Sequence, residues 1–106
     1  MTKKEKILAL RVALLIAVSE AEKMKYTEDE GTSNMDAPTI YLPEWSESDI
    51  NEAFQLTGLV PSRHKEAIYI LRACEGQGYR RTAMAEAFCK SLRASGYTAA
   101  VDYRLD

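Results

Sequence analysis

Residues 7–18 constrain the fold more than any other stretch of this chain, because Arg11 is the only polar residue among them. Such a run predicts the buried middle of a long helix. Thr2 and Glu5 have the spacing of a capping box, which places the start of that helix near Lys3. Apolar residues fall on nearly all sides of the helix. We therefore expect it to be covered on several sides, by the rest of the chain or by a second copy.

The same run can be interpreted as a membrane span or a signal peptide, and its length and flanks argue against both. At 1.5 Å per residue it reaches about 18 Å, well short of the roughly 30 Å hydrocarbon core of a bilayer. As a signal peptide it would be interrupted by Arg11, and no clean small-residue cleavage site follows it. We expect a cytoplasmic protein that makes no contact with a membrane.

Composition indicates one globular domain that spans residues 1–106. The chain is 46% hydrophobic and 28% charged, an ordinary composition for a domain of this length that can bury a core without crosslinks. Two cysteines are too few for a disulfide framework, so we expect both to be thiols.

The net charge of −2 conceals an uneven distribution. Between residues 20 and 52, ten Asp and Glu stand against Lys23 and Lys25, a local balance of −8. One interpretation is a solvated acidic segment that keeps a small protein in solution. The other is a surface that attracts a basic partner.

Residues 26–38 read as an acidic loop. If Gly31 took the sixth position of an EF-hand, Tyr26 and Ala37 would fill the first and twelfth, where carboxylates are required, so this spacing excludes an EF-hand. Residues 39–42 are short, β-branched and aromatic between two prolines, which predicts an edge strand.

A second helix is predicted at residues 47–57. Ser46 has the position of its N-cap, Trp45 can pack on Ile50 as a hydrophobic staple, and Gly58 is placed to end the helix.

Two further helices and one strand complete the expected elements. A third helix at 62–75 would carry an apolar stripe of His64, Ala67, Ile68, Leu71 and Cys74. A fourth at 80–95 would present Met84, Ala85, Phe88, Cys89 and Leu92 and end at Gly96. Residues 98–104 alternate between apolar and polar side chains and predict a strand.

The residues that could carry chemistry do not form a catalytic or metal-binding pattern in the sequence. His64 is the only histidine, and on an apolar stripe it is interpreted as a structural residue. In a hairpin of the third and fourth helices, Cys74 and Cys89 would lie about 12 Å apart along the axis, too far for a disulfide. We expect no enzymatic activity, no metal and no cofactor.

Residues 53–71 loosely resemble a helix-turn-helix unit, with a short turn at Gly58 and a second helix that opens on Arg63 and Lys65. The resemblance implies a DNA-binding regulator that uses residues 47–75. The implied contacts are Ser62, Arg63 and Lys65 with base edges, and Tyr69, Arg72, Arg80 and Arg81 with phosphates. A pI near 5.5 argues against strong phosphate affinity, so direct nucleic-acid binding is the alternative hypothesis.

The sequence therefore predicts an α+β domain with four helices around a central first helix and a two-stranded antiparallel sheet of residues 39–42 and 98–104. We expect a non-enzymatic interaction protein, of the regulator or inhibitor type, that binds a basic protein partner through its acidic 20–52 segment. Basic nucleic-acid-binding proteins are one candidate class of partner, and a homodimer is also expected. The candidate partner-binding residues are Glu28, Asp29, Glu30, Asp36, Glu44, Trp45 and Glu47.

Overall fold

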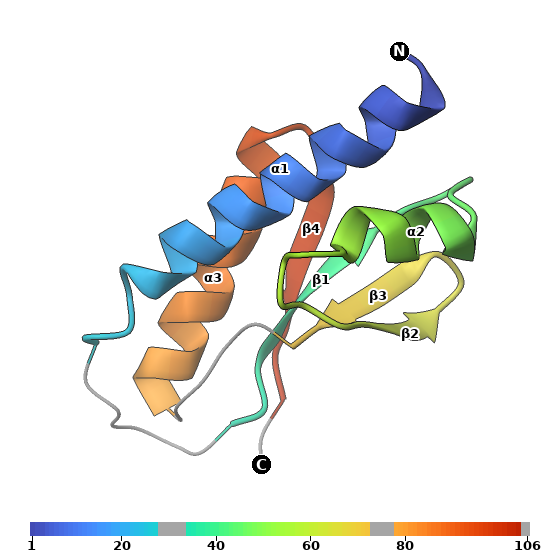
Figure 1. Cartoon of the computed structure of the whole chain (residues 1–106). Helices are drawn as coiled ribbons and strands as arrows, with labels where there is room; N and C mark the ends of the chain where they lie inside the picture. Colours follow the sequence, from blue (N-terminus) through green and yellow to red (C-terminus); the bar gives the residue numbers. More distant parts are fainter. Residues whose placement is uncertain (28–33, 73–77, 105–106) are drawn as a thin grey trace.

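The computed structural model describes residues 1–27, 34–72 and 78–104, and this part of the chain forms an α+β fold (Figure 1). It contains three helices and one four-stranded antiparallel sheet, so the expected four helices and two-stranded sheet are wrong. In chain order the elements are α1 (Lys3–Glu22), β1 (Ala37–Tyr41), α2 (Glu47–Phe54), β2 (Pro61–Lys65), β3 (Ile68–Leu71), α3 (Gly78–Ala94) and β4 (Thr98–Asp102).

The strands lie in the order β2-β3-β1-β4. From β1 onward the elements run β-α-β-β-α-β, and β3 lies between β1 and β2, which is the split arrangement of ferredoxin-like folds. The helix α1 precedes this unit. The inner strand β1 pairs with β3 on one side and with β4 on the other. Thr39 of β1 lies opposite Ile70 and Ala100, and Ile40 lies opposite Tyr69 and Ala99.

The expected helix at 62–75 is replaced by the β2–β3 hairpin, and this is the main error of the sequence interpretation. The spacing of its apolar residues suits a helix, but Ile68, Tyr69 and Ile70 are β-branched or aromatic residues that fit a strand equally well. Pairing of β3 with β1 decides between the two. Ala67 has a positive φ of 60° in the hairpin turn, and His64 lies exposed on β2 instead of on an apolar stripe.

Several local predictions are confirmed. The capping box of Thr2 and Glu5 is present, and the Ser46 hydroxyl accepts a hydrogen bond of 3.1 Å from the Asp49 backbone N–H. Strands β1 and β4, expected at 39–42 and 98–104, pair antiparallel within one chain. The helix α2 ends at Phe54, before the predicted residue 57.

The three helices and one face of the sheet enclose the core. Helix α3 packs on β1 and β4, and α1 packs on both α3 and α2 (Figure 1). Ile40, Tyr69 and Ala99 point into the core, whereas Tyr41 on the opposite face of the sheet is exposed. The apolar stripe predicted for the last helix is buried as expected, with Met84, Ala85, Phe88, Cys89 and Leu92.

Candidate interaction surfaces

The outer side of α1 is a continuous apolar surface. Leu8, Val12, Leu15 and Ile16 are 44%, 54%, 43% and 47% exposed, and we call these four residues the outer α1 face. They recur at the spacing of one helical side. The opposite side of α1 is buried, with Ile7, Leu10, Ala13, Leu14, Ala17 and Ala21. Within the single chain this helix is therefore covered on one side, and the expectation that a second copy covers the rest stays a prediction.

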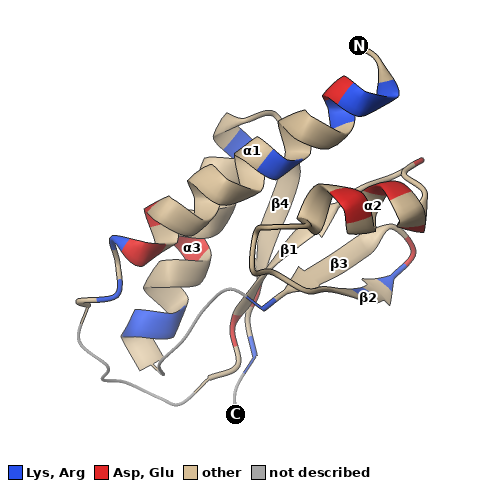
Figure 2. Cartoon of the chain, viewed as in Figure 1, with Lys and Arg blue, Asp and Glu red and all other residues tan. Residues whose placement is uncertain are grey.

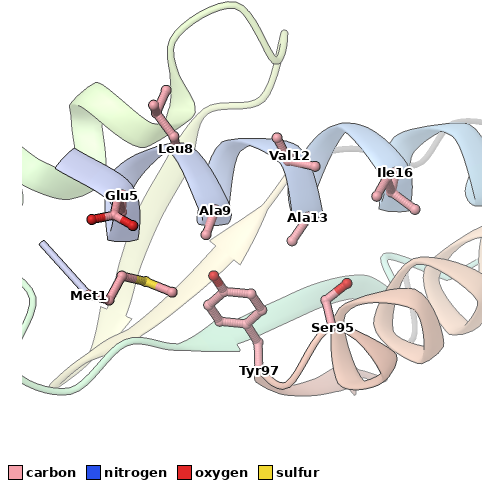
Figure 3. A pocket seen from close by; sticks show the side chains of 9 residues that line it. All are labelled: Met1, Glu5, Leu8, Ala9, Val12, Ala13, Ile16, Ser95 and Tyr97. Atoms are coloured by element: carbon pink, nitrogen blue, oxygen red, sulfur yellow. The ribbon is translucent and has the colours of Figure 1, made fainter. Parts of the chain in front are cut away.

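A groove of about 480 Å³ runs along one flank of the outer α1 face (Figure 3). Tyr97, which follows α3, points from the far side of the groove toward α1, and Ser95 lies beside it. Burial raises the pKa of the Tyr97 hydroxyl above its ordinary value of 10.0, which disfavours the charged phenolate in this wall of the groove. A second groove of about 500 Å³ shares Ile16 and Ser95 with the first and continues between α1 and α3.

The predicted partner-binding acids do not form one surface in the described part of the chain. Glu28, Asp29 and Glu30 lie outside the described residues. Glu44 and Glu47 are exposed before and at the start of α2, where Figure 2 shows the acids of this helix. Glu47 lies 3.5 Å from the Arg63 guanidinium, so part of its charge is balanced within the chain.

Asp36 has a structural role instead of a surface role. Its side chain is among the buried polar groups, and the residue is only 5% exposed. One carboxylate oxygen accepts a hydrogen bond of 2.7 Å from the Thr82 hydroxyl, and the other accepts one of 2.8 Å from the Arg104 backbone N–H. The Asp36 carbonyl accepts a further bond of 2.8 Å from Arg81. These contacts join the start of β1 to α3 and to the chain after β4.

Trp45 is partly buried against the hydrophobic core, as the staple interpretation expects of it. The Lys6 ammonium lies 5.0 Å from the centre of its ring, a cation–π distance that links the start of α1 to the turn before α2. Trp45 therefore has internal contacts that account for its position without a partner.

The residues proposed for DNA contacts are spread over different elements. Ser62, Arg63 and Lys65 lie on the edge strand β2, and Tyr69 is buried in β3. Arg80 and Arg81 in α3 donate to the backbone carbonyls of Thr27 and Asp36, at 3.2 and 2.8 Å, while Arg72 is exposed after β3. Because residues 61–71 form strands, the recognition helix of the alternative hypothesis is not formed there.

Arg11 has a structural role that the sequence interpretation did not assign to it. Its guanidinium donates to the carbonyl oxygens of Glu52 and Ala53, at 2.6 and 3.4 Å, and so caps the end of α2. The signal for such a role was available, because a lone charge in an apolar helix needs a partner. Nothing in the sequence pointed to the carbonyls of α2 as that partner.

The remaining reactive side chains are separated from one another. Cys89 is buried in α3, and burial raises the pKa of its thiol, which disfavours the nucleophilic thiolate. Cys74 lies outside the described residues. Within residues 1–27, 34–72 and 78–104, no three His, Cys, Asp or Glu side chains are grouped so that they could hold a metal ion.

Comparisons with protein-family models, curated proteins and solved structures find no significant match to this chain. Of the helices in the described ranges, none combines the length and apolar character needed to cross a bilayer.

Proposed function

We propose that this chain is a small non-enzymatic interaction protein, of the regulator or inhibitor type, that binds through the outer α1 face and its flanking groove. The observation that carries the proposal is the exposure of four large apolar side chains on one side of a single helix. Large apolar side chains gathered on one side of a surface helix can pack against a partner, and such patches occur at sites of association. The groove next to Tyr97 provides a concave edge into which a partner's side chains can pack.

The chemistry of the partner is proposed from the charges beside this surface. Glu44, Glu47 and Glu52 are exposed on α2 and before it, and α2 packs against α1. A basic protein that contacts the outer α1 face would be attracted by these acids, which raises its association rate. The same apolar face supports self-association, so a homodimer belongs to the proposal. The buried thiol of Cys89 is compatible with a reducing, cytoplasmic location.

Capture of binding partners from the host's own extract tests the proposal. The bait proteins are the unchanged chain, Val12→Glu, the pair Glu44→Lys with Glu47→Lys, and Val60→Glu as control. Val60 is 61% exposed and lies outside α1, so the control makes the same substitution at an exposed apolar position elsewhere. The captured protein is then purified, and its affinity for each variant is measured by calorimetry.

We expect a basic protein that binds the unchanged chain and Val60→Glu equally, and that Val12→Glu loses. Burying an unpaired carboxylate in an apolar contact should weaken binding by at least about 2 kcal/mol. Reversing Glu44 and Glu47 should mainly slow association and reduce its dependence on salt. Equal capture by the unchanged chain and Val12→Glu would refute the assignment of the outer α1 face.

A further inference from the structure

We propose that the outer α1 face binds the same face of a second copy, with the two α1 helices antiparallel about a two-fold axis at Val12. This inference rests on the proposed function, since it names one partner for the same surface. The apolar spacing and the charges of α1 both fit this arrangement.

The apolar side chains of the outer α1 face are symmetric about Val12. Leu8 and Ile16 each lie four positions from it, so an antiparallel copy centred there places Leu8 of one chain against Ile16 of the other. Val12, the most exposed of the four, meets its own copy at the axis. Leu15 then meets the small Ala9, which leaves room for close approach of the helices.

The charges at the two ends of α1 also favour the antiparallel direction. The N-terminal end carries Lys3, Lys4 and Lys6, visible as the blue end of α1 in Figure 2. An antiparallel copy brings Lys4 of one chain to Glu20 of the other, about 24 Å away along the same helix. Lys4 has no ion pair within the described residues, and Glu20 is held 2.9 Å from Lys23 of its own chain. A parallel pair would instead bring two lysine-rich ends and two helix dipoles into repulsion.

The size of this contact sets the strength of the expected dimer. A helix of about 24 Å length and 10 Å width covers about 240 Å² per chain, well below the roughly 800 Å² of a standard interface. The rims of the flanking groove, including Ser95 and Tyr97, enlarge the area. We therefore expect a weak, concentration-dependent dimer with a dissociation constant in the micromolar range, and measurements must reach about 1 mM of chain.

Sedimentation equilibrium from about 1 μM to 1 mM gives the dissociation constant of the dimer. Val12→Glu places two carboxylates against each other at the axis and should weaken the dimer at least about 30-fold. Val60→Glu makes the same substitution outside α1 and should leave the dissociation constant within about twofold. Both positions are exposed, so neither change should unfold the chain, which far-ultraviolet circular dichroism verifies.

A charge exchange between Lys4 and Glu20 tests the direction of the pair. In the antiparallel dimer, Lys4→Glu alone sets two carboxylates against each other at each end of the contact, and Glu20→Lys alone sets two ammonium groups against each other there. Each variant should dimerise about 3- to 10-fold more weakly at low salt. In an equimolar mixture of the two variants, the heterodimer sets a carboxylate against an ammonium group at both ends of the contact. This follows because the Lys4→Glu chain carries only carboxylates at these two positions and the Glu20→Lys chain carries only ammonium groups. The double variant, with Lys4→Glu and Glu20→Lys in one chain, restores an opposite-charge pair at both ends, and its dissociation constant should lie within about twofold of the unchanged chain. In a parallel pair, Lys4→Glu only exchanges one like-charge contact for another and has no such effect.

A chain that remains monomeric at 1 mM would overturn the inference. So would a dimer that Val12→Glu leaves intact, since its contact would then lie elsewhere, for example at the free edges of β2 and β4. A dimer weakened by Val12→Glu but unaffected by Lys4→Glu would overturn the antiparallel direction. None of these results refutes binding of another protein at this surface, which the capture experiment tests separately.

Discussion

Replacing Asp36 by Ala should destabilise the protein strongly, because its carboxylate is buried and holds two donors. The substitution leaves the Arg104 backbone N–H without its acceptor, and the Thr82 hydroxyl exchanges a charged acceptor at 2.7 Å for the Gly78 carbonyl at 3.1 Å, in a region where Asp36 is 5% exposed. Each buried donor that loses its partner costs about 1–3 kcal/mol. Water can enter near the chain end and satisfy part of the loss, so we expect about 2–4 kcal/mol in the free energy of unfolding.

The size of this effect makes it easy to measure. With about 2.1 cal/mol/K of unfolding entropy per residue, a chain of 106 residues loses about 4–5 °C in Tm for each kcal/mol. The expected fall in Tm is therefore about 9–18 °C, and urea denaturation at 25 °C gives the free energy independently. Asp36→Asn keeps one acceptor oxygen and should lose less than Asp36→Ala.

Asp102→Ala is the matched control, because it removes the same side chain two residues before Arg104. Asp102 pairs with the Arg104 guanidinium at 2.7 Å, and this partly exposed ion pair should contribute less than about 1 kcal/mol. Combining Asp36→Ala with Thr82→Val should cost less than the sum of the single changes, since both remove the same bond. A decrease in the free energy of unfolding below about 0.5 kcal/mol for Asp36→Ala would refute the structural role of this carboxylate.

Three further predictions concern Arg11, Trp45 and Cys89. Arg11→Ala removes both bonds to the last carbonyls of α2 and should lower the free energy of unfolding by about 1–3 kcal/mol, measured in urea, with Arg11→Lys intermediate. Trp45→Ala should lower the melting temperature by loss of core packing and leave the affinity for a captured partner nearly unchanged. A loss of binding free energy above about 2 kcal/mol at constant stability would instead identify Trp45 as a binding anchor. Burial raises the pKa of the Cys89 thiol above its ordinary value of 9.0, so the protonated thiol favours the folded state. This stability is present below pH 9.0 and is lost as the pH rises through the folded-state pKa. The urea midpoint of the unchanged chain should therefore fall in alkali, and that of Cys89→Ala should fall less steeply.

Much of the local structure could be predicted because it depends on neighbouring residues. The capping box of Thr2 and Glu5 and the cap at Ser46 are set by side chains three positions apart along the chain. The buried stripe of α3 follows from helical spacing, and Gly96 ends that helix with a φ of 94° that glycine adopts without strain. The pairing of β1 with β4 was also predicted, from alternation in one strand and composition in the other.

The candidate site was predicted only in part, because surface exposure is not a local property. Asp36 and Glu44 belong to the same acidic segment, yet one carboxylate is enclosed by residues of α3 and the chain after β4, and the other is exposed. The outer α1 face appeared in the sequence as one side of an all-round apolar helix. Which side would remain exposed depended on where α2 and α3 pack.

The sequence by itself therefore determined where α1 begins, which side of α3 is buried, and that the middle of the chain is acidic. The tertiary structure alone decided that residues 61–71 form a hairpin, that Asp36 is enclosed, and that one side of α1 stays uncovered. The spacing of residues 64, 67, 68 and 71 suits a helix, whereas the β-branched and aromatic residues at 68–70 suit a strand. Hydrogen bonds between β3 and β1 join residues about thirty positions apart, and only those long-range contacts make the strand the more stable choice.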